Sequence, residues 1–259
     1  MSLLFEIIVC ILAGAGAGIG TGFAGLSAAV FITPMLVAFL DAPVYEAVGI
    51  ALASDVLASA VSAWTYGRQG NIDLKRGLPL FISVIVFAII GSLVAFLISS
   101  VQLGDTVLGY WSIVASIGLG FSFLHRGKVK EPRDYSSRQL PVTLACGAFV
   151  GFVCGFQGTG GGMMMLFVLT VVMMFEFKHA VGTSVFIMTF TALIGSGTHF
   201  AINGMPDLSM LCLCVLSTLV FARGAAVLAN RLAPQTLRFV TGILLTVSGL
   251  VMLVTKVFL

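Results

Sequence analysis

The chain has 259 residues, of which 59% are hydrophobic and only 9% are charged, and its mean hydropathy is +1.14. A soluble domain carries about 25% charged residues, so the charges here are too few to cover a globule in water. The net charge of +3 is small, and no basic stripe interleaved with aromatic residues suggests nucleic acid as a partner. The composition predicts an all-α integral membrane protein with the lipid bilayer as its main solvent.

Apolar segments follow one another along the whole chain. Most are about 20 residues long, which at 1.5 Å per residue matches a hydrocarbon core about 30 Å thick. The first and the fifth are much longer, and each has a glycine cluster in its middle, which predicts two helical pieces joined at membrane depth. We therefore expect about 8–10 membrane segments and a glycine-broken helix in each half of the chain. The segments are 3–40, 44–66, 77–100, 106–124, 140–175, 179–202, 208–229 and 236–257.

The glycine clusters belong to an internal repeat. The sequence GFAGLSAA at Gly22–Ala29 has its counterpart 133 positions later in GFQGTGGG at Gly155–Gly162. The same offset relates the tripeptide AVG at Ala47–Gly49 to AVG at Ala180–Gly182. Agreement at one offset in separate patches predicts that the chain consists of two homologous halves.

A polar stretch at 125–139 separates the expected first transmembrane repeat, 1–124, from the second, 140–259. Its excess of Lys and Arg predicts a cytoplasmic linker in a multi-pass protein of the cell (inner) membrane. If the long segment 140–175 crosses the membrane an odd number of times, the halves are parallel repeats; if it dips in and returns, they are inverted. The charges of the turns favour the inverted arrangement.

The two breaks are the expected substrate site, because discontinuous helices at corresponding positions of two repeats are typical of transporter sites. The helix that follows a break begins with unpaired N–H groups and partial positive charge, which favours an anion. Small neutral donors beside the breaks suit a small oxyanion, although each hydroxyl has the alternative of bonding to its own helix. The candidate substrate-binding residues are Thr21, Gly22, Gly25, Ser27, Gln157, Gly158, Thr159, Gly160, Gly161, Gly162, Thr183 and Ser184.

Two charged residues lie inside apolar runs. Asp55 should face a cavity or a partner, since a carboxylate at membrane depth costs about 2.5–3.5 kcal/mol. It is a candidate carrier of a coupling proton, or it pairs with a base such as Arg223. Arg223 itself either neutralises an anionic substrate or extends its side chain to the membrane surface.

Other polar and aromatic residues have simpler expected roles. Trp64 and Tyr66 fall near a segment end, where aromatic residues line the membrane interface. His199 follows Ser196 by three residues, but the G-x-S-x-G pattern of a serine nucleophile is missing, so a packed or interfacial histidine is expected. The histidines and cysteines match no metal or haem spacing. We therefore expect neither an enzyme nor a cofactor nor a metal site.

The repeated glycine breaks, with AVG-T-S at Ala180–Ser184 in the second half, resemble the TauE/SafE family of sulfite-exporter-like permeases over nearly the whole chain. The resemblance implies transport of a small anion such as sulfite, sulfate or sulfoacetate, often outward. It places Gly158–Gly162 and Thr183-Ser184 on one side of the site and Gly22–Ser27 on the other. The first half departs from the pattern, because Ile50-Ala51 stands at the position of Thr183-Ser184.

The sequence thus predicts a secondary transporter of a small anion by alternating access, and the resemblance implies that the anion is sulfite or an organosulfonate such as sulfoacetate and that it is exported. Without a G-x-x-x-x-G-K-[ST] loop it would not hydrolyse ATP, so protons or the membrane potential are the expected driving force. Other copies of the chain are a further expected partner. The alternatives are a transporter of another solute, a carboxylate or a metal cation, or a scaffold subunit that transports nothing.

Overall fold

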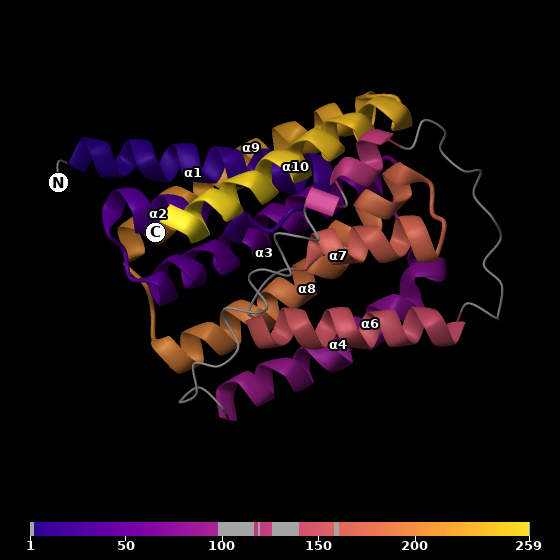
Figure 1. Cartoon of the computed structure of the whole chain (residues 1–259), viewed down its shortest axis with the longest axis horizontal. Coiled ribbons are helices and arrows are strands. Elements are labelled where there is room, and N and C mark those ends of the chain that lie inside the picture. The colour runs from indigo at the N-terminus through magenta and orange to yellow at the C-terminus, as the bar shows by residue number, and fades with distance from the viewer. Residues whose placement is uncertain (1–2, 98–116, 119, 126–139, 158–160, 259) are drawn as a thin grey trace.

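The computed structural model describes residues 3–97, 117–118, 120–125, 140–157 and 161–258. All regular elements in these residues are helices (Figure 1). They are α1 (Leu3–Ala24), the 3-10 turn η1 (Ala28–Val30), α2 (Ile32–Leu40), α3 (Val44–Arg68), α4 (Leu74–Leu97), α6 (Leu140–Gln157), α7 (Gly162–Phe167), the π-helical turn η3 (Val168–Val172), α8 (Phe177–Asn203), α9 (Leu208–Arg231) and α10 (Pro234–Phe258). Residues 120–125 are helical as well.

Six helices in the described residues are long and apolar enough to cross a membrane: α1, α3, α4, α8, α9 and α10. Three shorter apolar helices, Ala28–Leu40, Leu140–Phe156 and Gly162–Val172, belong to the two segments for which a break was predicted. The multi-pass all-helical membrane protein is therefore confirmed. The first break is seen between α1 and η1, and the second lies between α6 and α7, where residues 158–160 are outside the described part. The total number of membrane segments stays a prediction, because residues 98–116 lie outside the described part.

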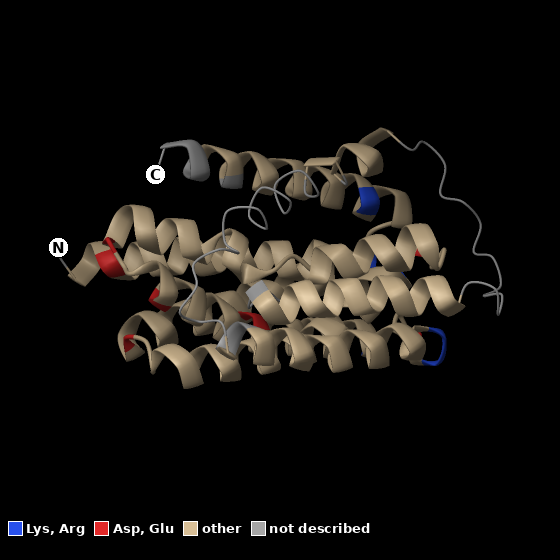
Figure 2. Cartoon of the chain, turned by 60° about the horizontal axis from the view of Figure 1, so that its bottom comes forward, with Lys and Arg blue, Asp and Glu red and all other residues tan. Residues whose placement is uncertain are grey.

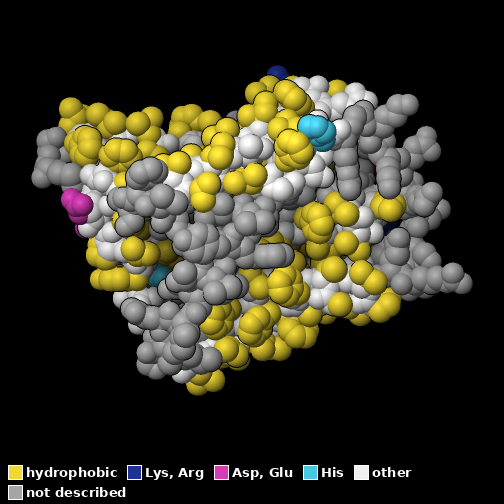
Figure 3. Space-filling model, viewed as in Figure 1, with side chains coloured by type: hydrophobic (Ala, Val, Ile, Leu, Met, Phe, Trp, Pro, Cys, Tyr) yellow, Lys and Arg dark blue, Asp and Glu magenta, His cyan; other side chains and the backbone are white. Residues whose placement is uncertain are grey.

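The charged residues lie mainly at the two ends of the bundle (Figure 2). At one end, here called the acidic end, the Ser209 hydroxyl donates to Glu6 and the Asp207 backbone N–H donates to Glu46. At the other, here called the basic end, Lys178 donates to the Asn230 carbonyl at 2.9 Å. Between the ends, hydrophobic side chains cover much of the described surface on the face in Figure 3. This is the surface that a protein surrounded by lipid requires.

Small residues bring pairs of helices into close contact at equivalent places in the two halves. A glycine every fourth residue on α1 faces α9, and a Cβ atom on any of these glycines would lie 2.9 Å or less from an α9 atom. Glycines on α6 pack in the same way against α4. Such spacing puts the glycines on one face and lets backbones approach. They are Gly14, Gly18 and Gly22 in α1 and Gly147, Gly151 and Gly155 in α6, which are 133 positions apart.

The helices α3 and α8 cross antiparallel at the centre of the bundle. A Cβ atom on Gly49, early in α3, would lie 3.1 Å from the ring of His199, late in α8. A Cβ atom on Gly182, early in α8, would lie 3.0 Å from Tyr66, late in α3. The glycines of the two AVG patches therefore allow this crossing: Gly49 leaves room for the ring of His199, and Gly182 leaves room for the backbone at Asn71 and for Tyr66.

The two broken segments enter the bundle from opposite ends. Helix α1 starts at the acidic end with Glu6, and after the break α2 leads back to that end. Helix α6 runs parallel to α4 from the basic end, and α7 with η3 returns there, where Arg76 donates to the Met173 carbonyl at 3.5 Å. The breaks meet inside: a Cβ atom on Gly162 would overlap the carbonyl oxygen of Gly25.

Candidate functional site

The first break is a short turn that satisfies most of its own backbone. Gly25 has φ +64°, a conformation that favours glycine, and its N–H donates to the Thr21 carbonyl at 2.9 Å. The Thr21 hydroxyl lies 2.8 Å from the Leu26 carbonyl and 2.9 Å from that of Ala17 in its own helix. Thr21 thus holds the turn together, and its alternative role of back-bonding is the one observed. Gly22 packs α1 against α9 rather than lining the break.

The side chain of Asp55 on α3 contacts the turn of the first break. Its carboxylate is fully buried and accepts hydrogen bonds from the Ser27 hydroxyl at 2.5 Å and from the Ala28 backbone N–H at 2.6 Å. These donors stand just before and at the start of η1, where a bound anion would otherwise be expected. Among the described residues, no lysine, arginine or histidine lies within ion-pair distance of Asp55.

Asp55 is the first residue of a polar stripe along α3. Ser59, Ser62 and Tyr66 follow at i+4, i+7 and i+11, which puts all four side chains on one face, and all are buried. The Tyr66 hydroxyl donates to the Gly22 carbonyl at 3.1 Å. The expectation of an interfacial Tyr66 was therefore wrong: its hydroxyl satisfies a carbonyl of the broken helix. The polar spacing along 55–66 is a sequence signal that could have identified this face.

The second break ends at Gly161, which has φ +63°. Gln157 is the last residue of α6; its side chain and the predicted site residues Gly158, Thr159 and Gly160 lie outside the described part of the chain. A Cβ atom on Gly162 would lie 2.6 Å from the sulfur of Met188. Met188 stands 133 positions after Asp55, so a thioether faces the second break where a carboxylate faces the first.

The hydroxyls of Thr183 and Ser184 have different surroundings although the residues are adjacent. Thr183 accepts a hydrogen bond from the Asp73 backbone N–H at 3.2 Å, in the α3–α4 loop. The Ser184 hydroxyl is buried, lies 2.7 Å from the position of a Cβ atom on Gly25, and has no hydrogen-bond partner in the described structure. The structure thus brings Ser184, but not Thr183, to the first break.

Arg223 lies away from the breaks. It is exposed on α9, and its guanidinium carbon is 6.0 Å from the centre of the Trp64 ring on α3. Trp64 is 51% exposed, as expected for an interfacial aromatic. Asp55 and Arg223 therefore have different partners, and the predicted pair between them does not form in this structure.

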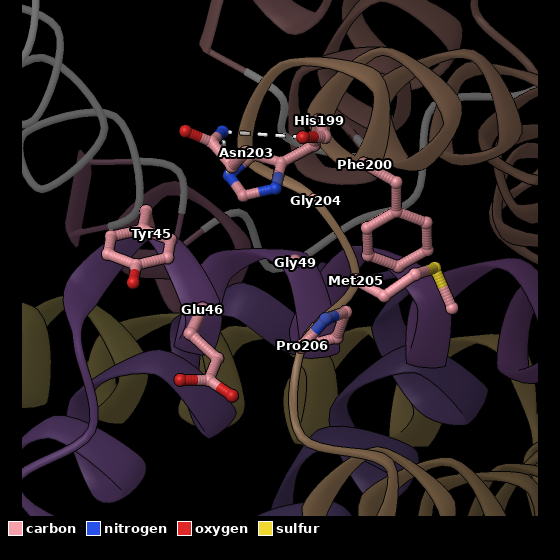
Figure 4. A pocket seen from close by; sticks show the side chains of 9 residues that line it. All are labelled: Tyr45, Glu46, Gly49, His199, Phe200, Asn203, Gly204, Met205 and Pro206. Atoms are coloured by element: carbon pink, nitrogen blue, oxygen red, sulfur yellow. Dashed lines mark hydrogen bonds between the residues drawn. The ribbon is translucent and has the colours of Figure 1, made fainter.

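His199 lines a separate small pocket at the acidic end, with a volume of about 110 Å³ (Figure 4). Its ring lies beside Asn203, opposite Tyr45 and Glu46 of α3. Since water occupies about 30 Å³ in the liquid, the pocket has room for a few waters and not for a large substrate. The Ser196 hydroxyl bonds to the Leu193 carbonyl of its own helix, so no Ser–His pair forms.

The site thus consists of one carboxylate, a few neutral donors and two breaks in contact. With one ionisable group and hydroxyl and N–H donors around it, it can exchange a proton and hold a small polar solute. Over the described residues there is no cluster of three His, Cys, Asp or Glu side chains that could hold a metal ion.

Comparison with known proteins agrees with this architecture. The family described as sulfite exporter TauE/SafE matches residues 10–252. The probable membrane transporter protein YunE of Bacillus subtilis is 27% identical over 216 residues, 77% of this chain and 78% of YunE. YdhB of B. subtilis is 24% identical over 91% of this chain and 96% of its own, and MJ0441 of Methanocaldococcus jannaschii is 25% identical over 91% and 88%; both carry the same description. No solved structure gives a significant match. The match over nearly the whole length shows that the chain belongs to the TauE/SafE family of membrane transporter proteins.

Proposed function

We propose that the protein is a secondary transporter that exports a small anion, sulfite or an organosulfonate such as sulfoacetate, through a site where the two breaks meet. The family description supports the substrate class and the outward direction. The observation that carries the site is the buried Asp55 carboxylate, held by the Ser27 hydroxyl and the Ala28 N–H at the first break. The unpartnered Ser184 hydroxyl on the same break supplies a further donor for the anion.

Asp55 couples proton binding to anion binding in this proposal. The ionised carboxylate occupies the Ser27 and Ala28 donors and so takes the place of an anion. A protonated carboxyl group accepts less strongly and has lost the negative charge that would repel an anionic substrate. Proton and anion therefore bind more tightly together than apart, and by linkage each raises the affinity of the site for the other.

The hydrogen bonds of the first break favour an anion over a metal cation. A cation site built from the broken helix would use its carbonyl oxygens, as broken helices in transporters often do. The carbonyls of Gly22, Phe23 and Leu26 instead accept bonds from side-chain hydroxyls of Tyr66, Thr241 and Thr21. The two groups that bond to Asp55, the Ser27 hydroxyl and the Ala28 N–H, are hydrogen-bond donors, so they suit an anionic substrate rather than a cation.

We propose further that the halves, 1–124 and 140–259, are inverted repeats that rock against each other. The antiparallel crossing of α3 and α8 supports this, as do the glycine contacts that recur with an offset of 133. The broken segments that open to opposite ends of the bundle support it too. The positive-inside rule puts the basic end, and with it the 125–139 linker, in the cytoplasm; residues 126–139 of that linker lie outside the described residues.

The experiment is sulfite and sulfoacetate flux in proteoliposomes that contain the purified chain, with and without a pH gradient, for the natural sequence and for Asp55→Asn. Asparagine keeps the shape of a neutral carboxyl group but binds no proton. We expect saturable flux that a pH gradient accelerates several-fold in the natural chain, and residual flux without a pH response in Asp55→Asn.

Ser54→Ala is the matched control. Ser54 is the buried neighbour of Asp55, but its hydroxyl bonds to the Ile50 carbonyl of its own helix at 2.8 Å, so flux and pH response should stay. An unchanged pH response in Asp55→Asn would remove Asp55 from the coupling. Lack of flux for every small anion tested, with folded protein, would refute the proposed function.

A further inference from the structure

A wide groove lies on the side of the bundle between α3 and α8, apart from the breaks. Its volume is about 510 Å³, and its lining is almost entirely apolar. The lining residues are Ala60, Ala63, Trp64, Gly67, Arg68, Ile72, Phe186, Thr189 and Phe190. The groove holds none of the residues assigned to transport above, so it needs an explanation of its own.

The groove opens to lipid. Its α3 wall continues at helical spacing from Ala60 to Leu57, and its α8 wall from Phe190 to Leu193; Leu57 is 45% exposed and Leu193 is 56% exposed. Large exposed leucines on both walls would contact hydrocarbon in a membrane protein. An apolar groove that continues such a surface has the chemistry to receive an acyl chain.

Arg68 lines one end of the groove, and Arg223 of α9, outside the lining, lies over the ring of the same tryptophan, Trp64. Arg68, the last residue of α3, has its guanidinium carbon 4.4 Å from the Trp64 ring centre, and that of Arg223 is 6.0 Å from the same ring. Neither forms an ion pair within the described part of the chain, and both are exposed. This end of the groove is at the basic end of the bundle, where the indole of Trp64 would lie at the level of the lipid headgroups.

We propose that this groove binds an anionic phospholipid of the leaflet at the basic end. An acyl chain fills the apolar part between α3 and α8, and the headgroup phosphate lies between Arg68 and Arg223. Guanidinium groups match phosphate oxygens with paired hydrogen bonds, whereas a zwitterionic lipid would bring its own cation to the same place. The lipid therefore packs against the pair of helices that carry Asp55 and Ser184 deeper in the bundle.

The test uses the fluorescence of Trp64. The chain has two tryptophans, so Trp111→Phe leaves Trp64 as the sole reporter. The protein is titrated in mixed micelles with phosphatidylglycerol or phosphatidylcholine brominated on the acyl chains, which quench a nearby indole. At about 1 kcal/mol for each of the two arginines, we expect phosphatidylglycerol to quench at a roughly thirtyfold lower mole fraction.

Variants separate the headgroup from the chain. Arg68→Gln with Arg223→Gln should abolish the preference, whereas Lys75→Gln, an exposed cation at the same end but outside the groove, should preserve it. Ala60→Phe fills the groove and should weaken quenching by both lipids.

Other outcomes overturn the proposal. One is equal quenching of Trp64 by phosphatidylglycerol and phosphatidylcholine when both arginines are present. The other is a preference for phosphatidylglycerol that remains when Arg68 and Arg223 are both changed to Gln. Inorganic phosphate at the same concentration should leave quenching unchanged. Displacement of the lipid by phosphate would indicate an anion site that does not need the groove.

Discussion

The two breaks occupy corresponding positions in the two halves, and different side chains face them. Each interrupts an apolar segment at a position set by the offset of 133: α1 ends at Ala24 and α6 at Gln157. At the first break a carboxylate, Asp55, holds the donors of the following turn. At the second, the thioether of Met188 stands at the corresponding place and packs against Gly162.

The difference shows that the repeat preserves backbone geometry while the side chains have diverged. The glycines that allow close packing recur in both halves, because a Cβ atom would clash at either copy. The carboxylate does not recur, because Met188 stands at the position that corresponds to Asp55. In our proposal the proton and the anion therefore both bind beside Asp55 at the first break, and the experiments below test how far the second break contributes.

The largest effect is expected from Gly162→Ala. The added methyl group would overlap the Gly25 carbonyl and press on Met188, where both breaks meet, so it must push them apart. Overpacking of this kind costs roughly 1–3 kcal/mol, and we expect transport to be lost altogether. Flux and melting temperature measured on the same preparation distinguish a displaced site from an unfolded chain.

Gly197→Ala is the control. Gly197 lies in the same bundle on α8, where an added Cβ has open space, so flux should be unchanged and stability slightly raised, by about 1 kcal/mol at most. If Gly162→Ala transported as well as Gly197→Ala, contact between the breaks would not matter for function.

A smaller effect is expected from making the breaks alike. Met188→Asp puts a second carboxylate against Gly162, where it would compete with a bound anion as Asp55 does. We expect the KM for sulfite to rise at least tenfold, and the rise to be partly reversed at acidic pH, where the new group is neutral. Met188→Leu, which conserves volume, should keep the KM of the natural chain. A KM equally raised in Met188→Leu would point to packing rather than charge.

Much of this arrangement could be predicted from the sequence. Runs of apolar residues predicted the membrane helices. The glycine clusters in the two overlong segments predicted the breaks, because glycine is a poor helix former. The repeat spacing also indicated where the two halves correspond. These features depend on local composition, which the chain shows directly.

Side-chain partners could not be predicted in the same way. Asp55 was recognised as costly in a membrane, but its partners, Ser27 and Ala28, lie 28 and 27 residues away in the turn of the first break. Arg223 was an equally reasonable partner by charge alone, yet it lies over Trp64. Tyr66 was expected at the interface because it is close to the end of α3, and only the packing of α1 against α3 shows that it is buried.

The smallest effect is expected from two aromatic residues, Tyr66 and His199, which lie next to the AVG glycines. Tyr66 lies against Gly182 and bonds to the Gly22 carbonyl, while His199, its counterpart, lies against Gly49 and has an Nδ1 atom without a partner in the described structure. Tyr66→Phe leaves a buried carbonyl unsatisfied, which costs about 1–3 kcal/mol and should lower the melting temperature by a few degrees. His199→Phe keeps an aromatic ring and loses only a weak contact with Asn203, so it should lower the melting temperature less. If His199→Phe lowered the melting temperature more than Tyr66→Phe, the His199 pocket at the acidic end would contribute more to stability than the Tyr66 hydrogen bond at the first break.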